Sequence, residues 1–158
     1  MKSAYSFLAI CLLLLISCSE DIVPSPYTYT QVFTGKNSKT WAVRFLEETL
    51  NGNVVDRFTI SCATDDKYIF YANTERKYEV LTGTRKCNPT SEAGTIENVW
   101  SFTNSSATLT MLLPFFSATN TLPFIVREAE KKTLEIEIFL DEENTQSYRI
   151  HFESIAEE

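Results

Sequence analysis

The 158-residue sequence is poor in glycine and proline and has no long apolar segment. Four glycines and five prolines are too few for a collagen-like or low-complexity chain, and seven tyrosines with eleven phenylalanines are too many for a disordered one. The 14 basic residues are outnumbered by 21 acidic ones and form no basic stripe, which argues against nucleic-acid binding. What remains is one globular domain with a packed core.

The common catalytic motifs are also missing. The sequence has no Gly-rich phosphate loop, no Gly-x-Ser-x-Gly elbow and no His-Glu-x-x-His. His151, the single histidine, lies between Arg149 and Glu153 on an alternating strand and is expected to face solvent, not to catalyse. Asp65 and Asp66 are interpreted as a turn before a strand, with a calcium site as the alternative. We therefore predict a protein that is not an enzyme and uses no metal or cofactor.

The first 17 residues have the pattern of an export signal. Lys2 precedes an uncharged apolar run at residues 8–16, which is too short to cross a bilayer. The run ends at Leu15-Ile16-Ser17-Cys18, which resembles the lipobox of bacterial lipoproteins. That resemblance implies a diacylglyceryl group on the Cys18 thiol, cleavage just before Cys18, and acylation of the new amine, with palmitate as an expected acyl chain.

Two or more acyl chains hold a protein stably on a membrane, so the expected protein is anchored and not inserted. The alternative is an ordinary secretory signal that is cut elsewhere, with Cys18 as a bystander. Ser19 resembles the residue that sorts lipoproteins to the outer membrane. Ser19-Glu20-Asp21 also resembles the signal that takes lipoproteins of one Gram-negative phylum to the cell surface. We expect an outer-membrane lipoprotein on the periplasmic face or the cell surface.

Two cysteines, Cys62 and Cys87, remain after Cys11 leaves with the signal and Cys18 is acylated. In an oxidising compartment such a pair is expected to form a disulfide. Closing this loop would contribute about 3 kcal/mol on the chain-entropy model. A metal pair would lack further ligands, since His151 lies far along the chain.

Three segments follow from these patterns. Residues 1–17 are the signal, residues 18–34 are a lipidated N-terminus with a flexible tether, and residues 35–158 are the folded domain. The tether contains Pro24 and Pro26 and shows no sustained periodicity. As a flexible chain it would reach on the order of 20 Å.

Alternation of apolar and polar residues dominates the domain. Leu134, Ile136 and Ile138 alternate with glutamates, and Asn51-Gly52 supplies a tight hairpin turn. Residues 141–144 are interpreted as another hairpin turn. Eight or nine strands with short polar turns predict an all-β fold, an antiparallel up-and-down meander closed into a barrel.

Large aromatic side chains are predicted to share the inner face of this barrel. An eight-stranded barrel either fills with side chains or holds one small ligand, and a filled core is the favoured interpretation. The predicted inner face comprises Trp41, Phe45, Phe58, Tyr68, Phe70, Tyr78, Trp100, Phe102, Phe124, Tyr148, Ile150 and Phe152. The candidate ligand-binding residues are Trp41, Phe70, Tyr78, Trp100, Phe115, Phe116, Phe124 and Tyr148.

Residues 112–116 and 122–125 differ from the other strands because they are apolar on both faces. They are interpreted as a hydrophobic lip at the barrel mouth, a partner-binding patch, or a strand pair buried on both sides. The three alternatives stay open at this point.

Ordered landmarks from Gly35 to Glu153 resemble the lipocalin-like domains of bacterial lipoproteins. The landmarks are the segment from Gly35 to Trp41, Cys62 followed by an acidic pair and an aromatic strand, Cys87, Gly94, residues 100–102, 109–111 and 134–140, and the final strand at 148–152. The resemblance implies a barrel that binds small apolar ligands. Lipocalins proper carry Gly-x-Trp at the first strand and an arginine on the last strand that packs over the tryptophan. This chain departs from both features: five residues separate Gly35 from Trp41, and Arg149, the counterpart of the arginine, lies on the charged face of its strand.

The expected function is therefore that of a membrane-anchored lipoprotein that binds a small hydrophobic ligand at the cell envelope. The alternative is an interaction or structural module with a filled barrel core, which binds another envelope protein. No nucleic acid is expected as a partner. Fold alone does not decide between these functions.

Overall fold

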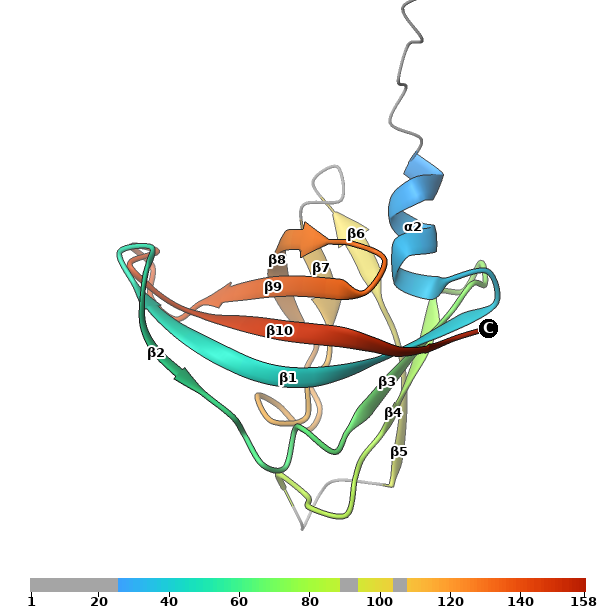
Figure 1. Ribbon diagram of the computed structural model, residues 1–158, viewed down its shortest axis with the longest axis horizontal. Coiled ribbons are helices and arrows are strands. Elements are labelled where there is room, and N and C mark those ends of the chain that lie inside the picture. Colours follow the sequence, from blue (N-terminus) through green and yellow to red (C-terminus); the bar gives the residue numbers. More distant parts are fainter. Residues whose placement is uncertain (1–25, 89–93, 104–107) are drawn as a thin grey trace, which may run out of the picture.

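The computed structural model describes residues 26–88, 94–103 and 108–158 (Figure 1). Within these ranges, one short helix precedes ten strands, so the predicted all-β fold is confirmed. Residues 1–25, with the signal and Cys18, and residues 89–93 and 104–107 lie outside the described residues. The elements are α2 (Pro26–Thr34), β1 (Ser38–Leu50), β2 (Asn53–Phe58), β3 (Lys67–Tyr71), β4 (Lys77–Leu81), β5 (Thr95–Val99), β6 (Ser101–Thr103), β7 (Thr108–Met111), β8 (Leu122–Ala129), β9 (Thr133–Phe139) and β10 (Gln146–Glu157).

The strands form an antiparallel meander that curls into a nearly closed nine-strand barrel, as predicted. The hydrogen-bonded order is β5-β4-β3-β1-β10-β9-β8-β7-β6, so the first and last strands pair with each other. The start of β1 pairs with β3, and its far half pairs with β2, which stands off the barrel path. The long strands β1 and β10 therefore continue beyond the barrel wall.

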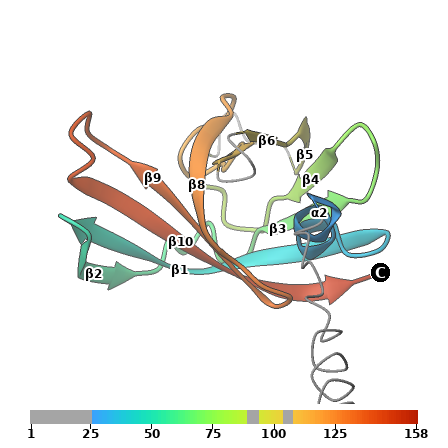
Figure 2. The ribbon, with the colours of Figure 1, turned by 90° about the horizontal axis from the view of Figure 1, so that it is seen from above.

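The tips of two hairpins meet at the end remote from α2 (Figures 1 and 2). Asn51 and Gly52 have φ values of 50° and 79°, the left-handed pair that a tight hairpin turn needs, so the predicted turn is confirmed. The Asn51 amide donates to the carbonyl of Thr145 at 2.6 Å. The Asp141 carboxylate accepts backbone bonds from Thr145 and Gln146 and fixes the predicted turn at residues 141–144.

A disulfide and an aspartate pair bind two loops at the base of the barrel. Cys62 and Cys87 are bonded, as predicted. Asp65 and Asp66 lie at the end of a turn before β3, and Asp66 accepts a bond from the Gly83 amide at 2.8 Å. A Cβ atom at Gly83 would lie 2.1 Å from Cγ of Asp65, so the close approach of residue 83 to the Asp65 carboxylate requires glycine.

The inside of the barrel is filled by large side chains. Phe33 is fully buried and contacts Phe102 at 4.9 Å and Phe70 at 6.0 Å between ring centroids. Fully buried side chains in this cluster also include Trp41, Tyr68, Phe70, Tyr78, Val80, Leu109, Met111, Phe124, Ile136 and Ile150. Side chains therefore fill the interior of the barrel.

The flexible tether predicted for residues 18–34 is wrong in its second half, because α2 occupies Pro26–Thr34. Proline is favoured at a first helical position, and Gly35, at φ 63°, donates to the carbonyl of Gln31 at 2.9 Å to close the helix. The Trp41 indole donates to the carbonyl of Phe33 at 2.9 Å. Contacts with residues distant in the sequence hold this helix in place, so the local pattern of apolar residues could not predict it.

The inner-face position predicted for Phe45 is also wrong. A register shift between Val43 and Phe45 interrupts the alternation of β1. Phe45 consequently pairs with His151 on the outer face, and the two rings stack at 4.2 Å.

The segment apolar on both faces is not a strand pair over its whole length. β7 ends at Met111, Leu112 and Leu113 follow without regular structure, and a turn begins at Pro114; all three residues are buried. Phe115 and Phe116 remain half-buried at the barrel end. Within the residues that the structure describes, no helix has the length and apolarity that crossing a bilayer requires.

We predict that Phe33→Ala lowers the free energy of unfolding by about 3–5 kcal/mol, because it leaves a cavity among aromatic rings. Urea unfolding of the purified protein measures the loss. Gln31→Ala, at an exposed position of the same helix, should change little. A loss below about 1 kcal/mol for Phe33→Ala would mean that α2 is a tether after all.

Candidate functional site

The structure separates the eight predicted ligand-binding residues into two groups. Five lie in the filled core with no more than 2% of their surface exposed: Trp41, Phe70, Tyr78, Trp100 and Phe124. The other three, Phe115, Phe116 and Tyr148, are half-buried. Phe116 contacts both others, with ring centroids 4.8 Å from Phe115 and 6.1 Å from Tyr148.

These three rings belong to a larger apolar surface at the barrel end remote from α2. Phe58 extends the row by packing on Tyr148 at 5.8 Å. Leu50 and Leu140, 48% and 44% exposed, follow on the strands that flank Tyr148. We call Phe58, Phe115, Phe116, Tyr148, Leu50 and Leu140 the far-end surface. Exposed apolar side chains that gather in one region in this way are typical of binding sites.

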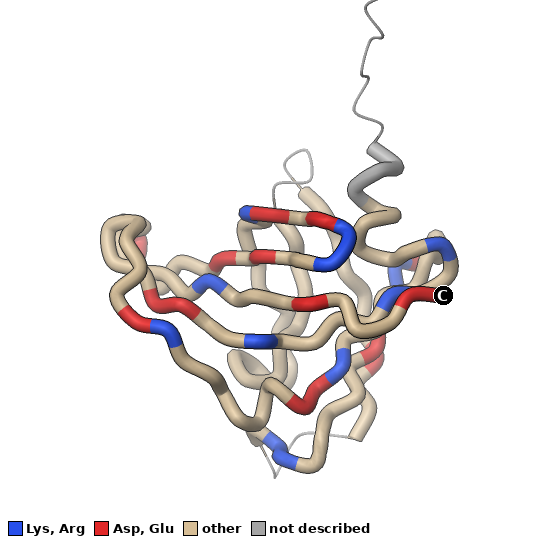
Figure 3. The backbone as a smooth tube through the Cα atoms, in the orientation of Figure 1, with Lys and Arg blue, Asp and Glu red and all other residues tan. Residues whose placement is uncertain are grey.

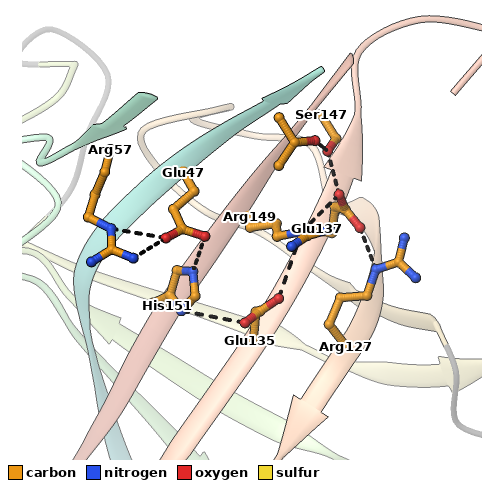
Figure 4. Close-up of polar contacts among 9 residues, drawn as sticks. Glu47, Arg57, Arg127, Glu135, Glu137, Ser147, Arg149 and His151 are labelled. Atoms are coloured by element: carbon orange, nitrogen blue, oxygen red, sulfur yellow. Dashed lines mark hydrogen bonds and ion pairs between the residues drawn. The ribbon is translucent and has the colours of Figure 1, made fainter. Parts of the chain in front are cut away.

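The outer face of the same strands carries a row of alternating charges (Figure 4). Glu47 on β1 accepts bonds from Arg57 on β2, and its other oxygen lies 3.2 Å from Nε2 of His151. Nδ1 of His151 lies 3.6 Å from Glu135 on β9. His151 thus lies on the outer face, as predicted, but between two carboxylates and not free in solvent.

Glu137 on β9 is the most enclosed member of the row. Its carboxylate is 2% exposed and accepts bonds from Ser147 and Arg127, while Nε of Arg149 lies 3.2 Å away. The Ser147 hydroxyl also contacts Oγ1 of Thr49 at 2.5 Å. Five strands, β2, β1, β10, β9 and β8, are therefore cross-linked on their outer face.

The pKa values of both buried carboxyls lie below the ordinary range. Burial raises the pKa of Glu137, but hydrogen bonds from Ser147 and Arg127 and the charges of Arg127 and Arg149 outweigh it. Burial likewise raises the pKa of Glu47, and bonds from Arg57 and His151 outweigh it. Both groups stay ionised and fully engaged, so neither offers a free base, and Ser147 is too buried to act as a nucleophile.

Sequence reasoning missed this row because its members lie far apart in the chain, and Glu47 and His151 are separated by 104 positions. The signal that could have revealed it is the charged alternation on two strands. Glu135 and Glu137 lie opposite His151 and Arg149 once β9 and β10 are paired. Opposite charges on facing strands stabilise a sheet, so the row is a structural brace.

Two surface cavities lie away from the far-end surface. One, of about 280 Å³, adjoins the charged row and is lined among others by Arg44, Phe45 and Glu135. The other, of about 300 Å³, lies at the base of α2 and includes Lys36, Lys39 and Lys131 in its lining. Across residues 26–88, 94–103 and 108–158, no three His, Cys, Asp or Glu side chains converge as a metal ion would require.

Comparison with models of known protein families and with curated protein sequences gave no match for this chain.

We predict that Glu137→Gln lowers the free energy of unfolding at pH 7 by about 1.5–3 kcal/mol, the range for hydrogen bonds to a charged group. Because the folded pKa is lowered, the stabilisation is complete above the unfolded glutamate pKa of about 4.3 and is lost as the pH falls through the folded value. Urea unfolding from pH 7 to pH 3 should show wild type and variant converging in acid.

The matched control is Glu142→Gln, at an exposed position in the β9–β10 turn. It should leave both the stability and its acid dependence unchanged. A constant gap between wild type and Glu137→Gln at every pH would contradict the assignment.

Proposed function

We propose that the protein is a lipid-anchored module of the bacterial outer membrane that binds another envelope protein through the far-end surface and catalyses no reaction. The observation that carries the proposal is the packing of the barrel. Trp41, Phe70 and Tyr78 have no exposed surface, so the interior offers these rings to each other and not to a cargo molecule. Binding is then left to the outside of the barrel.

The far-end surface supports a protein partner. Of the six exposed large hydrophobic side chains among the described residues, four lie at the two hairpin tips: Leu50, Val54, Val55 and Leu140. Leu50 and Leu140 lie on the same strand face as Tyr148, so one partner could cover these two side chains together with the ring row. Aromatic side chains at the centre of an interface supply much of its binding energy.

The lipid anchor is supported by the sequence around Cys18 and by the disulfide. A Cys62–Cys87 bond is typical of proteins that leave the reducing cytoplasm. An export signal, an acylated Cys18 and a disulfide are consistent with one another, and together they support the envelope as the location.

A small apolar ligand is the second candidate, and the ring row favours it. Phe58, Tyr148 and Phe116 present half-buried ring faces and edges next to each other, as sites for small apolar molecules do. The lipocalin-like function predicted from sequence would then be carried out at the barrel end.

We predict that Cys18→Ser moves the protein out of the membrane fraction, because the acyl chains are lost. Cys11→Ser, inside the signal, should leave it in that fraction. Fractionation and the intact mass of the N-terminal peptide measure the outcome. A mature chain that begins upstream of Ser19 without acyl groups would rule out the anchor.

We predict that Phe115→Ser with Phe116→Ser abolishes binding at the far end while the midpoint of thermal unfolding falls by only a few degrees, since both rings are half-buried. The control is Val99→Ser with Ile155→Ser, which changes two exposed residues away from this surface. Crosslinking in intact cells reports a protein partner, and native mass spectrometry reports a small molecule. Unchanged binding, or a collapse of stability, would mean that the rings only complete the core.

A further inference from the structure

The cavity of about 300 Å³ at the base of α2 has an unbalanced charge. Its lining contains Lys36, Lys39 and Lys131 but only one carboxylate, that of Glu157. The remaining lining consists of Gln31, Val32 and Gly35. The cavity is thus basic in a chain that is acidic overall. Figure 3 shows basic segments at this end, on the β8–β9 turn and on the loop between α2 and β1.

Lys39 is the fixed centre of this cavity. Its side chain is 1% exposed, and Nζ donates to the carbonyl of Val32 at 2.9 Å and to that of Lys131 at 2.5 Å. Nζ also lies 4.6 Å from the centroid of the Trp41 ring and forms a 3.6 Å ion pair with Glu157, which is longer than a hydrogen bond. Burial lowers the pKa of Lys39; Glu157 opposes this shift, and the charge of Lys131 adds to it least. With three lysines and one carboxylate in its lining, the cavity is short of negative charge.

The position of the cavity points to the source of an anion. Cys18 precedes Pro26, the first residue of α2, by eight residues, which span at most about 28 Å when fully extended. If Cys18 is acylated, the barrel end that carries α2 must stay close to the bilayer. This step rests on the lipid anchor of the proposed function.

We propose that the cavity at the base of α2 binds the phosphate of an anionic phospholipid headgroup in the membrane that holds the protein. Lysine ammonium groups bind phosphate as point charges. Lys36 and Lys131 are exposed and can close on the headgroup, whereas Lys39 is already fixed. Lys132, the neighbour of Lys131 on the exposed β8–β9 turn, adds to the attraction. Headgroup binding would orient the barrel so that the far-end surface points away from the membrane.

Lysine acetylation of the acylated full-length protein, measured by mass spectrometry, tests the proposal. In phosphatidylglycerol vesicles, Lys36 and Lys131 should react at least about fivefold more slowly than in maltoside micelles, which contain no phosphate. Lys67, exposed at the end of β3 that lies away from the α2–β1 loop, serves as the internal control and should react equally in both. Equal rates for Lys36 and Lys131 in the two media would overturn the proposal.

Inorganic phosphate added to the micelles separates a headgroup site from a free-phosphate site. It should raise the midpoint of thermal unfolding by about 2–4 °C over chloride at equal ionic strength, because it binds the folded state. The rise should vanish in Lys36→Gln with Lys131→Gln and persist in Lys67→Gln with Lys77→Gln. A rise that is equal in both double variants, or protection by phosphate without protection in vesicles, would overturn the headgroup assignment.

The mass of the N-terminal peptide distinguishes the two proposals. An acylated Cys18 with unprotected lysines would contradict headgroup binding and leave the proposed function standing. An N-terminus without acyl groups would contradict both.

Discussion

The pairing of the first strand with the last is the contact on which the rest of this structure depends. Eleven residue pairs join β1 to β10, from Lys39 opposite Glu157 to Leu50 opposite Gln146. This ladder joins β5-β4-β3-β1 to β10-β9-β8-β7-β6 in one sheet, since without it both strands would have an open edge. It also builds two surfaces at once, because successive residues point to opposite faces. Leu46 and Ile150 point into the core, whereas Glu47 and Arg149 point to the outer face and belong to the charged row.

The charged row follows from this pairing and stiffens what extends beyond the barrel. β1 and β10 run on past the barrel wall, where β1 pairs with β2, which lies off the barrel path. Hydrophobic burial there is incomplete, as the exposure of Leu50 and Leu140 shows. Buried carboxylates at Glu47 and Glu137, each engaged by arginine, hold the strands together from the other side. A braced sheet can present apolar side chains to a partner without collapsing onto them.

Local patterns in the sequence predicted most of the fold and little of the site. The strand at residues 134–140 and the turn at Asn51-Gly52 depend on alternation and on left-handed backbone, which are local properties. Phe45 was misplaced because one register shift inverts the faces of a strand, and α2 was missed because Phe33 is held by contacts with distant rings. Pairing of Glu47 with His151 needs the register of two strands that lie about a hundred residues apart, and local periodicity carries no such information.

The helix α2 makes the two ends of the barrel different, because it packs at one end only. Phe33 fills one end of the barrel, and the carbonyls of Val32 and Phe33 accept bonds from Lys39 and Trp41, so the last turn of α2 is fixed to the start of β1. From there β1 runs 13 residues to the hairpin tip, a span of about 40 Å. A chain tied to a bilayer ahead of α2 would hold the near end of the barrel at the lipid and project the far-end surface into the surrounding medium. The position of α2 therefore determines which end of the barrel lies near the lipid and which end carries the far-end surface. The packing of Phe33 in the filled core fixes that position.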